Sequence, residues 1–192
     1  MIEPSAKPLI TVIVPGYNTA PYLPATLKSI QAQTFRDFEV IMVDDASNDE
    51  TLSIMQDYSA KNERCKVIPF HRNQGVVAAR NAALALACGD YIAMLDGDDI
   101  WTPDAMAFRV DVAQRHPSAD VVSTDFAWFE VDIPAQPVGR ISLGPRAKRA
   151  FAASYTTHEP AVLNNPFELV ATTHFAWTGA TLVRRAAMSA IG

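Results

Sequence analysis

Two periodicities alternate through the first 115 residues, and this alternation limits the fold more than any other feature. Short β-branched runs have the length of buried strands, and the segments between them repeat apolar side chains at the spacing of one helix face. The strands are predicted at residues 9–15, 38–45, 66–70 and 91–95. The helices are predicted at residues 20–33, 48–62, 75–89 and 103–115. Such alternation requires right-handed crossovers, so we predict an α/β protein with a Rossmann-like, mostly parallel, doubly wound sheet flanked by helices.

The pattern is weaker in the rest of the chain. Residues 119–131 predict a strand or hairpin, and residues 134–165, rich in Pro, Ser, Thr and Ala, predict a long irregular and mobile excursion. Strand-like alternation returns at residues 174–185, and residues 184–192 predict a helix. With no internal repeat and no boundary of a second domain, residues 1–192 are predicted to be one domain.

Composition excludes two classes of protein. Sixteen Lys and Arg against 21 Asp and Glu give a formal charge of −5, and no basic run suggests a nucleic-acid partner. No apolar run approaches the roughly 20 residues of a membrane span, and the N-terminus lacks the features of a secretory signal. We therefore expect a cytosolic chain without a transmembrane segment.

Carboxylates gather where the predicted strands end. Asp44 and Asp45 follow the second strand, while Asp96, Asp98 and Asp99 follow the fourth in the stretch "YIAMLDGDDIW". Ligands of open parallel sheets bind beyond this edge, and carboxylates so close together repel one another unless a cation offsets them. Mg or Mn accepts carboxylate oxygens and completes its shell with substrate phosphates. The pattern predicts a divalent cation that holds a diphosphate.

Structural interpretations of the same residues remain open. Asp99 could cap the following helix, Asp44 and Asp45 could form a turn with an Asx hydrogen bond, and Ser47 could cap the helix at 48–62. Trp101 is predicted to pack beneath the acidic loop. As a whole, the chain could also be a nucleotide-binding module without catalysis. A receiver-type signalling domain fits poorly, because a receiver keeps its acidic pair on the first strand.

The order of motifs resembles one enzyme family. The stretches "TVIVPGYNTAPYLPATLKSIQAQTFRDFEVIMVDDASNDET", "RNQGVVAARNAAL" and "GDYIAMLDGDDIWTPD" resemble the inverting nucleotide-sugar glycosyltransferases of family 2, which have the GT-A fold. Fainter similarity continues through "TGATLVRRAAMSAIG". The resemblance implies a nucleotide-binding half at about residues 9–104 and the start of an acceptor-side half, incomplete, at residues 105–192.

The resemblance also implies roles for residues around the nucleotide. Pro15 and Tyr17 match residues that edge the nucleoside base, and Asp45 matches the carboxylate that accepts a hydrogen bond from the uracil imide. Arg80 belongs near the same base and the diphosphate. These four residues lie on three segments that only folding brings together.

A second group is implied around the phosphates. Asn73 and Gly75 match the loop that leads into the helix at 75–89. Asp96 and Asp98 match the Asp-x-Asp motif, with Asp98 as the expected metal ligand and Asp96 facing the ribose or the waters of the metal. Asp99 is adjacent, and its role is left open.

The acceptor side is less clear from the sequence. Trp177, Thr178 and Gly179 are candidates for the acceptor or sugar pocket, with core packing as the alternative. The family's catalytic base is an Asp beyond the helix that residues 184–192 resemble, and no carboxylate follows Phe175. We therefore expect the base beyond Gly192, in a longer parent protein of which this chain resembles the donor-binding portion.

Together these features predict a metal-dependent, inverting glycosyltransferase. It would take a nucleoside diphosphate sugar, UDP-linked, with Mg or Mn, and transfer the sugar to a hydroxyl of a saccharide or lipid-linked saccharide. The usual setting of such relatives is bacterial exopolysaccharide or cell-envelope assembly. Association with the inner face of the membrane would depend on other parts of the parent protein.

Overall fold

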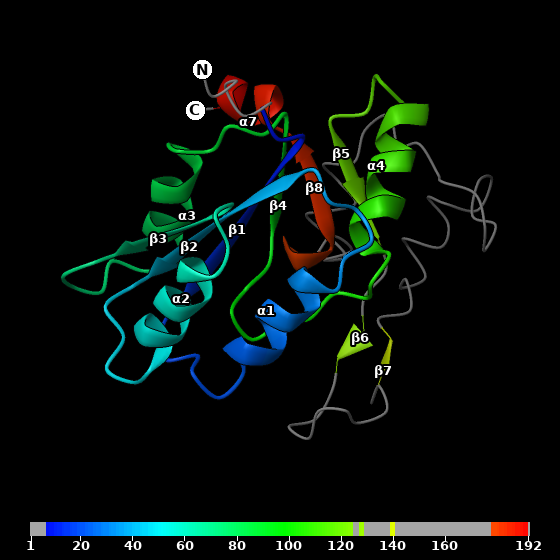
Figure 1. The fold of residues 1–192 in the computed structure, drawn as a ribbon. Coiled ribbons are helices and arrows are strands. Elements are labelled where there is room, and N and C mark those ends of the chain that lie inside the picture. Colours follow the sequence, from blue (N-terminus) through cyan, green and yellow to red (C-terminus); the bar gives the residue numbers. More distant parts are fainter. Residues whose placement is uncertain (1–6, 125–126, 129–138, 141–177, 192) are drawn as a thin grey trace, which may run out of the picture.

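A computed structural model describes residues 7–124, 127–128, 139–140 and 178–191 (Figure 1). Its main sheet has six strands in the order β3-β2-β1-β4-β8-β5. Four of them are parallel to one another: β1 (Ile10–Gly16), β2 (Phe38–Asp44), β3 (Cys65–Pro69) and β4 (Tyr91–Met94). β8 (Thr181–Arg184) is antiparallel to both β4 and β5 (Val121–Ser123). The predicted α/β class and mostly parallel sheet are confirmed.

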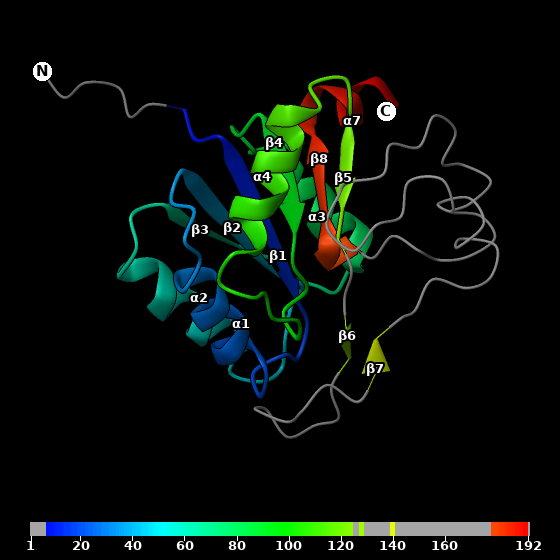
Figure 2. The ribbon, with the colours of Figure 1, turned by 90° about the vertical axis from the view of Figure 1, so that its right-hand side faces the viewer.

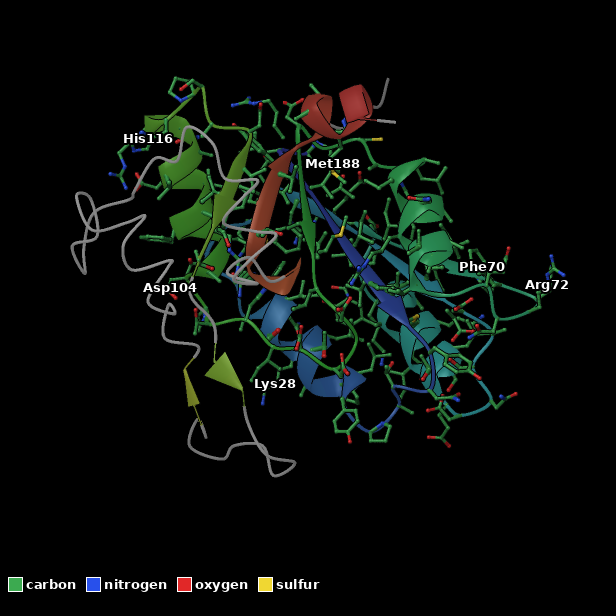
Figure 3. All side chains as sticks on the ribbon, turned by 180° about the vertical axis from the view of Figure 1, so that it is seen from behind. Lys28, Phe70, Arg72, Asp104, His116 and Met188 are labelled. Carbon is green, nitrogen blue, oxygen red and sulfur yellow. The ribbon has the colours of Figure 1, made fainter. Side chains whose placement is uncertain are left out.

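Helices cover both faces of this sheet (Figures 1 and 2). One face packs against α1 (Leu23–Gln31), α2 (Thr51–Ala60) and α4 (Ala105–Arg115). The other face packs against α3 (Val76–Leu84), and Met188 of α7 (Arg185–Ile191) is directed toward it (Figure 3). None of the helices in the described part of the chain has the length and apolar character needed to cross a membrane.

Alternation along the central strands explains the two cores. Val12 and Val14 of β1 face α1, α2 and α4, whereas Ile13 between them packs with Ile41 and α3. Every residue of β1 and β2 is buried, so these runs are mostly apolar, and their polar members Thr11, Glu39 and Asp44 are buried as well. This central pair fixes where the loops after β1 and β2 emerge.

Helix boundaries differ from the predictions in two places. α2 begins at Thr51 and its N-cap is Glu50, so the prediction that Ser47 caps this helix is wrong. Instead the Ser47 hydroxyl accepts a hydrogen bond from the Asn18 backbone N–H (3.0 Å), which joins the loops after β2 and β1. α3 ends at Leu84 rather than near Gly89, because the following residues turn back toward the start of β4.

Beyond α4 the chain is described only in parts. The strand predicted at residues 119–131 is confirmed as β5, and the short strands β6 (Ala127–Trp128) and β7 (Gly139–Arg140) pair as a small separate sheet. A 3-10 turn, η1 (Thr178–Ala180), precedes β8. The predicted mobile excursion at residues 134–165 lies outside the described residues except for β7. The predicted division into two halves stays a prediction.

Candidate functional site

Three loops meet at the carboxyl edge of the parallel strands. The Asp45 N–H donates to the Gly16 carbonyl (2.9 Å), and the Gly97 N–H donates to the Pro15 carbonyl (3.2 Å). The segments that follow β2 and β4 are therefore both bonded to the end of β1. This brings the two acidic motifs of the sequence to one edge, as expected for residues that follow parallel strands.

Glycine allows the loop after β4 to approach so closely. A Cβ atom on Gly97 would lie 2.9 Å from the Thr19 hydroxyl and 3.2 Å from the Pro15 carbonyl. The Gly97 carbonyl also accepts a hydrogen bond from Thr26 of α1 (3.0 Å). A larger residue between Asp96 and Asp98 would push this loop away from β1.

The carboxylate of Asp45 is buried and held by the loop before α3. One oxygen accepts from the Gln74 N–H (2.7 Å) and the other from the Gly75 N–H (2.8 Å), and Asp45 is 3% exposed. Asn73 donates from its side-chain amide to the Asp45 carbonyl (3.3 Å). Gly75, the N-cap of α3, has φ +86° and ψ 159°, a conformation that is essentially restricted to glycine. Asn73 and Gly75 thus belong to the loop that leads into α3, and this loop also holds Asp45, a link that the sequence did not predict.

Arg80 and Asp96 form an ion pair across the site. The guanidinium of Arg80, on α3, lies 2.6 Å from the Asp96 carboxylate after β4, and both side chains are about a quarter exposed. The Nε atom of Arg80 is buried and has no partner among the described residues. Arg80 therefore keeps one donor that no described residue uses.

The remaining carboxylates differ in what surrounds them. Asp98 is exposed and makes no hydrogen bond or ion pair to another described residue, whereas the Asp99 N–H donates to the Asp96 carbonyl (3.0 Å). Asp44 is buried and accepts from the Ser47 N–H (3.2 Å), so the predicted turn with an Asx-type bond is confirmed for Asp44. Asp99 does not cap α4, because Asp104 is the N-cap.

No complete metal site stands ready within the described residues, since no three His, Cys, Asp or Glu side chains converge there. The donor set nevertheless suits a hard cation. Asp98 offers an exposed carboxylate that no other described residue engages, and Mg or Mn typically takes one or two protein carboxylates and fills its shell with water and substrate phosphate. Asp96 is already engaged by Arg80, which leaves Asp98 as the better ligand.

The other predicted site residues are only partly placed. Pro15 is buried in β1 beside Val43. Tyr17, the first residue after β1, is 45% exposed, so a planar base could contact its ring. Trp177 lies outside the described residues. Thr178 and Gly179 form η1, and the Gly179 carbonyl faces the protein interior, where it accepts hydrogen bonds from Trp101 (2.6 Å) and Arg109 (3.2 Å).

A family model described as "Glycosyl transferase family 2" matches residues 11–192, nearly the whole chain. The chain belongs to glycosyltransferase family 2. Chondroitin synthase of Escherichia coli is 37% identical to it over 117 residues, which are 61% of this chain and 17% of that protein. The aligned stretch contains fewer residues than the family match, so the strongest similarity is confined to part of the domain.

Solved structures give the fold. TarS residues 1–349 of S. aureus in complex with UDP match with a TM-score of 0.70 and 26% identity, over 95% of this chain and 48% of that one. The mannosyltransferase PcManGT of Pyrobaculum calidifontis, in complex with GDP-Man and Mn2+, matches with a TM-score of 0.56 and 31% identity, over 62% and 36%. This family 2 chain has the GT-A fold, and it spans less than half of the length of these proteins. The alternative of a receiver domain is therefore wrong.

Arg109 was missed by sequence reasoning. It is one of two arginines in α4, and nothing in the spacing of the helix distinguishes it as the buried one. Its neighbours Trp101, Thr124 and Gly179 come from three other segments, so only the folded chain shows their association.

Proposed function

We propose that this chain binds a nucleoside diphosphate sugar, with uracil as the base and Mg or Mn as the cation, and contributes to sugar transfer with inversion. The observation that carries the proposal is the arrangement at the carboxyl edge. A buried, pre-oriented Asp45 follows β2, Arg80 of α3 pairs with Asp96 after β4, and Asp98 in the same loop has no partner among the described residues. The segments after β2 and β4 are both bonded to the end of β1.

The state of Asp45 supports uracil as the base. Each of its oxygens accepts one backbone N–H, which orients the carboxylate and leaves lone pairs for a donor on the base. Uracil presents a single N–H between two carbonyl groups, and this N–H is the group that Asp45 would accept. The UDP in the TarS complex agrees with this choice, and the GDP-Man of PcManGT is the contrasting case.

Asp98 and Arg80 are the groups for the diphosphate. Asp98 would hold the cation, and Arg80 would direct its unused donor toward a phosphate oxygen while Asp96 contacts the ribose. A bound divalent cation would supply neutralisation of the charge that develops on the leaving diphosphate. The chain's own residues then have the task of orienting the donor so that its anomeric carbon faces away from the β-strand edge.

Transfer requires an acceptor hydroxyl on the face of the sugar opposite the diphosphate, which gives inversion. The turn η1 borders the loop after β4 and is the described segment best placed for the sugar or acceptor. The same proposal includes an Asp that removes the hydroxyl proton and an acceptor that is a saccharide or a lipid-linked saccharide. It also includes a role in polysaccharide assembly and a cytosolic location. Both chondroitin synthase and the UDP-GlcNAc complex of TarS are compatible with it.

Titration calorimetry with UDP, GDP, CDP and ADP, each with and without Mn, tests the proposal. UDP should bind most tightly and should gain affinity from Mn, because Asp45 selects the base and Asp98 recruits the cation. Tighter binding of GDP would overturn the choice of base, and absence of binding by every nucleotide would overturn the proposed function.

A further inference from the structure

The turn η1 lies beside the acidic loop. β4 and β8 are antiparallel, with Ala93 opposite Leu182, so continuation of the register sets the residues before β8 against those after β4. Contacts between η1 and β4 agree with this placement. A shift of the loop that carries Asp96 and Asp98 would therefore act directly on η1, which is its neighbour.

Two side chains fix this turn through a single carbonyl. The Gly179 carbonyl accepts from Trp101 Nε1 (2.6 Å) and from Arg109 Nη2 (3.2 Å). The Arg109 guanidinium also donates to the Thr124 hydroxyl (3.3 and 3.4 Å), and Thr124 donates from its hydroxyl and its backbone N–H to the Ala180 carbonyl (3.1 and 2.9 Å). Two of the three carbonyls of the turn, those of Gly179 and Ala180, are thus held by residues in or next to α4 and β5.

Arg109 is an unusual residue for this task. It is 3% exposed, it stacks over the Trp101 ring at 5.0 Å, and its Nη1 atom has no partner among the described residues. No carboxylate of the described residues forms an ion pair with it. Burial lowers the pKa of Arg109 to about 10, so it is still a cation at neutral pH.

Stability alone does not account for such a group. The described partners of Arg109 are a carbonyl, a hydroxyl and an aromatic ring, and burial of a charge with such partners opposes folding. Well-packed apolar residues are often equally or more stabilising at such positions. Trp101 follows Asp98 by three positions in the chain, so one network joins the acidic loop, the aromatic ring and the turn.

We propose that Arg109 is a positioning residue that, together with Trp101, clamps η1 against the Asp96–Asp98 loop, so that ligand binding in the loop is transmitted to the turn. This rests on the proposed function, in which η1 borders the transferred sugar. Arg109 itself touches none of the nucleotide-site residues Asp45, Arg80 and Asp96. Its loss should loosen the turn while the nucleotide still binds.

Hydrogen exchange read by mass spectrometry on Arg109→Met tests this directly. Without ligand, amides of residues 178–184 should exchange about tenfold faster than in the unmodified chain, the effect of about one lost hydrogen bond, while β1 and β2 are unchanged. Arg115→Met is the matched control, since Arg115 lies on the same helix but is exposed and pairs with Asp111 (2.6 Å). Equal exchange of this segment in the two variants would overturn the clamp.

A second measurement separates positioning from simple support of the fold. With Mn and UDP, residues 178–184 should gain protection in the unmodified chain and in Arg115→Met but not in Arg109→Met, although UDP affinity stays within about twofold. Equal protection in all three would overturn the transmission to the turn. If no chain binds UDP, the proposed function fails, while the comparison without ligand still decides whether Arg109 holds the turn.

Two further variants guard against misfolding of Arg109→Met. Trp101→Phe keeps the ring but removes the second donor to Gly179, and Arg109→Lys keeps the charge but not the forked geometry. Each variant should accelerate exchange at residues 178–184 by less than Arg109→Met does. In the double variant the two effects on exchange should not add, because both side chains act on one carbonyl. Strict additivity would show that the two contacts are independent and would overturn the network.

Discussion

At the scale of single residues, the buried carboxylate of Asp45 is held in one orientation by the backbone N–H groups of Gln74 and Gly75. Its place after the second strand and its resemblance to a base-reading carboxylate were visible in the motif. Its two bonds to Gln74 and Gly75 were not, because they join positions about thirty residues apart through the loop before α3. The same holds for the Arg80–Asp96 pair, whose members the sequence named separately.

Asp45→Ala should weaken UDP binding without loss of the fold. The variant leaves two backbone N–H groups and the imide of the base without an acceptor, which predicts a loss of about 1 to 3 kcal/mol in binding free energy. The gap in affinity between UDP and CDP should also narrow. Calorimetry with both nucleotides measures these changes, and Asp57→Ala, at an exposed position of α2, is the control. An unchanged difference in affinity between UDP and CDP would show that Asp45 does not recognise the base.

Asp98→Asn should affect only the part of binding that depends on the cation. Asn keeps the shape of Asp98 but loses the charge, so the gain in UDP affinity on addition of Mn should fall by about tenfold or more. Binding of UDP without Mn should be the same in variant and unmodified chain. Asp104→Asn, six positions further and exposed, is the control. A full Mn effect in Asp98→Asn would rule out Asp98 as the ligand.

At the scale of elements, patterns predicted strands better than helix ends. Buried strands depend on composition within a few residues, and all four predicted parallel strands are present. Helix ends depend on which side chains reach the first free N–H groups. Here contacts between residues far apart in the sequence determine where the helix starts. Asp49 bonds the Thr51 N–H (2.9 Å), and Ser47 is drawn to Asn18, so α2 starts later than predicted.

Gly75→Ala should impair the loop that holds Asp45 and leave the rest of the molecule intact. A Cβ atom there would meet nothing within 4 Å, so the effect comes only from the backbone, where φ +86° costs a non-glycine residue about 1 to 3 kcal/mol. The loop should relax and turn its N–H groups away from Asp45. UDP affinity measured by calorimetry should fall about tenfold or more. The melting temperature of the variant should be only a few degrees lower than that of the unmodified chain.

Gly89→Ala provides the opposite contrast within the same chain. Its Cβ atom would lie 2.4 Å from the Thr11 backbone nitrogen and 2.6 Å from the Ile10 carbonyl carbon, at the amino edge of the sheet. Backbone atoms at these positions cannot move without distorting the sheet, so we expect the free energy of unfolding to fall by about 1 to 3 kcal/mol or more. Nucleotide affinity of the folded fraction should be unchanged. If Gly75→Ala lowered stability as much as Gly89→Ala without a specific loss of affinity, the loop would have no role in binding.

At the scale of the whole molecule, the two edges of the sheet have different tasks. The carboxyl edge collects the site, while the amino edge ties strands together through Glu39 of β2, which is buried. Glu39 accepts from the Thr11 hydroxyl of β1 (2.9 Å), the Cys88 N–H before β4 (2.8 Å) and Lys66 of β3 (3.1 Å). These bonds could not be predicted from the sequence, because a single Glu in an apolar run has no motif and its partners lie 27 to 49 positions away.

This arrangement predicts how stability depends on pH. Burial is the largest influence on Glu39 and acts to raise its pKa, but the bonds from Cys88, Thr11 and Lys66 together outweigh it, so the pKa is lower than the ordinary value. A lowered pKa in the folded state means that the contribution of Glu39 to stability is fully present above its unfolded pKa of about 4.3 and is lost as pH falls through the folded value. The ionised carboxylate therefore favours the folded chain at neutral pH.

Glu39→Gln should accordingly lower the free energy of unfolding by about 1 to 3 kcal/mol at neutral pH, because one side-chain oxygen that accepts hydrogen bonds becomes an amide donor. Below about pH 4 the deficit should shrink, since the unmodified Glu39 also loses its charge there. Urea unfolding from pH 7 to pH 3 measures both curves, with the exposed Glu63→Gln as a control that should follow the unmodified chain throughout. Parallel curves for Glu39→Gln and the unmodified chain would mean that ionised Glu39 does not join these strands, and the acid sensitivity of the fold would have to come from other carboxylates.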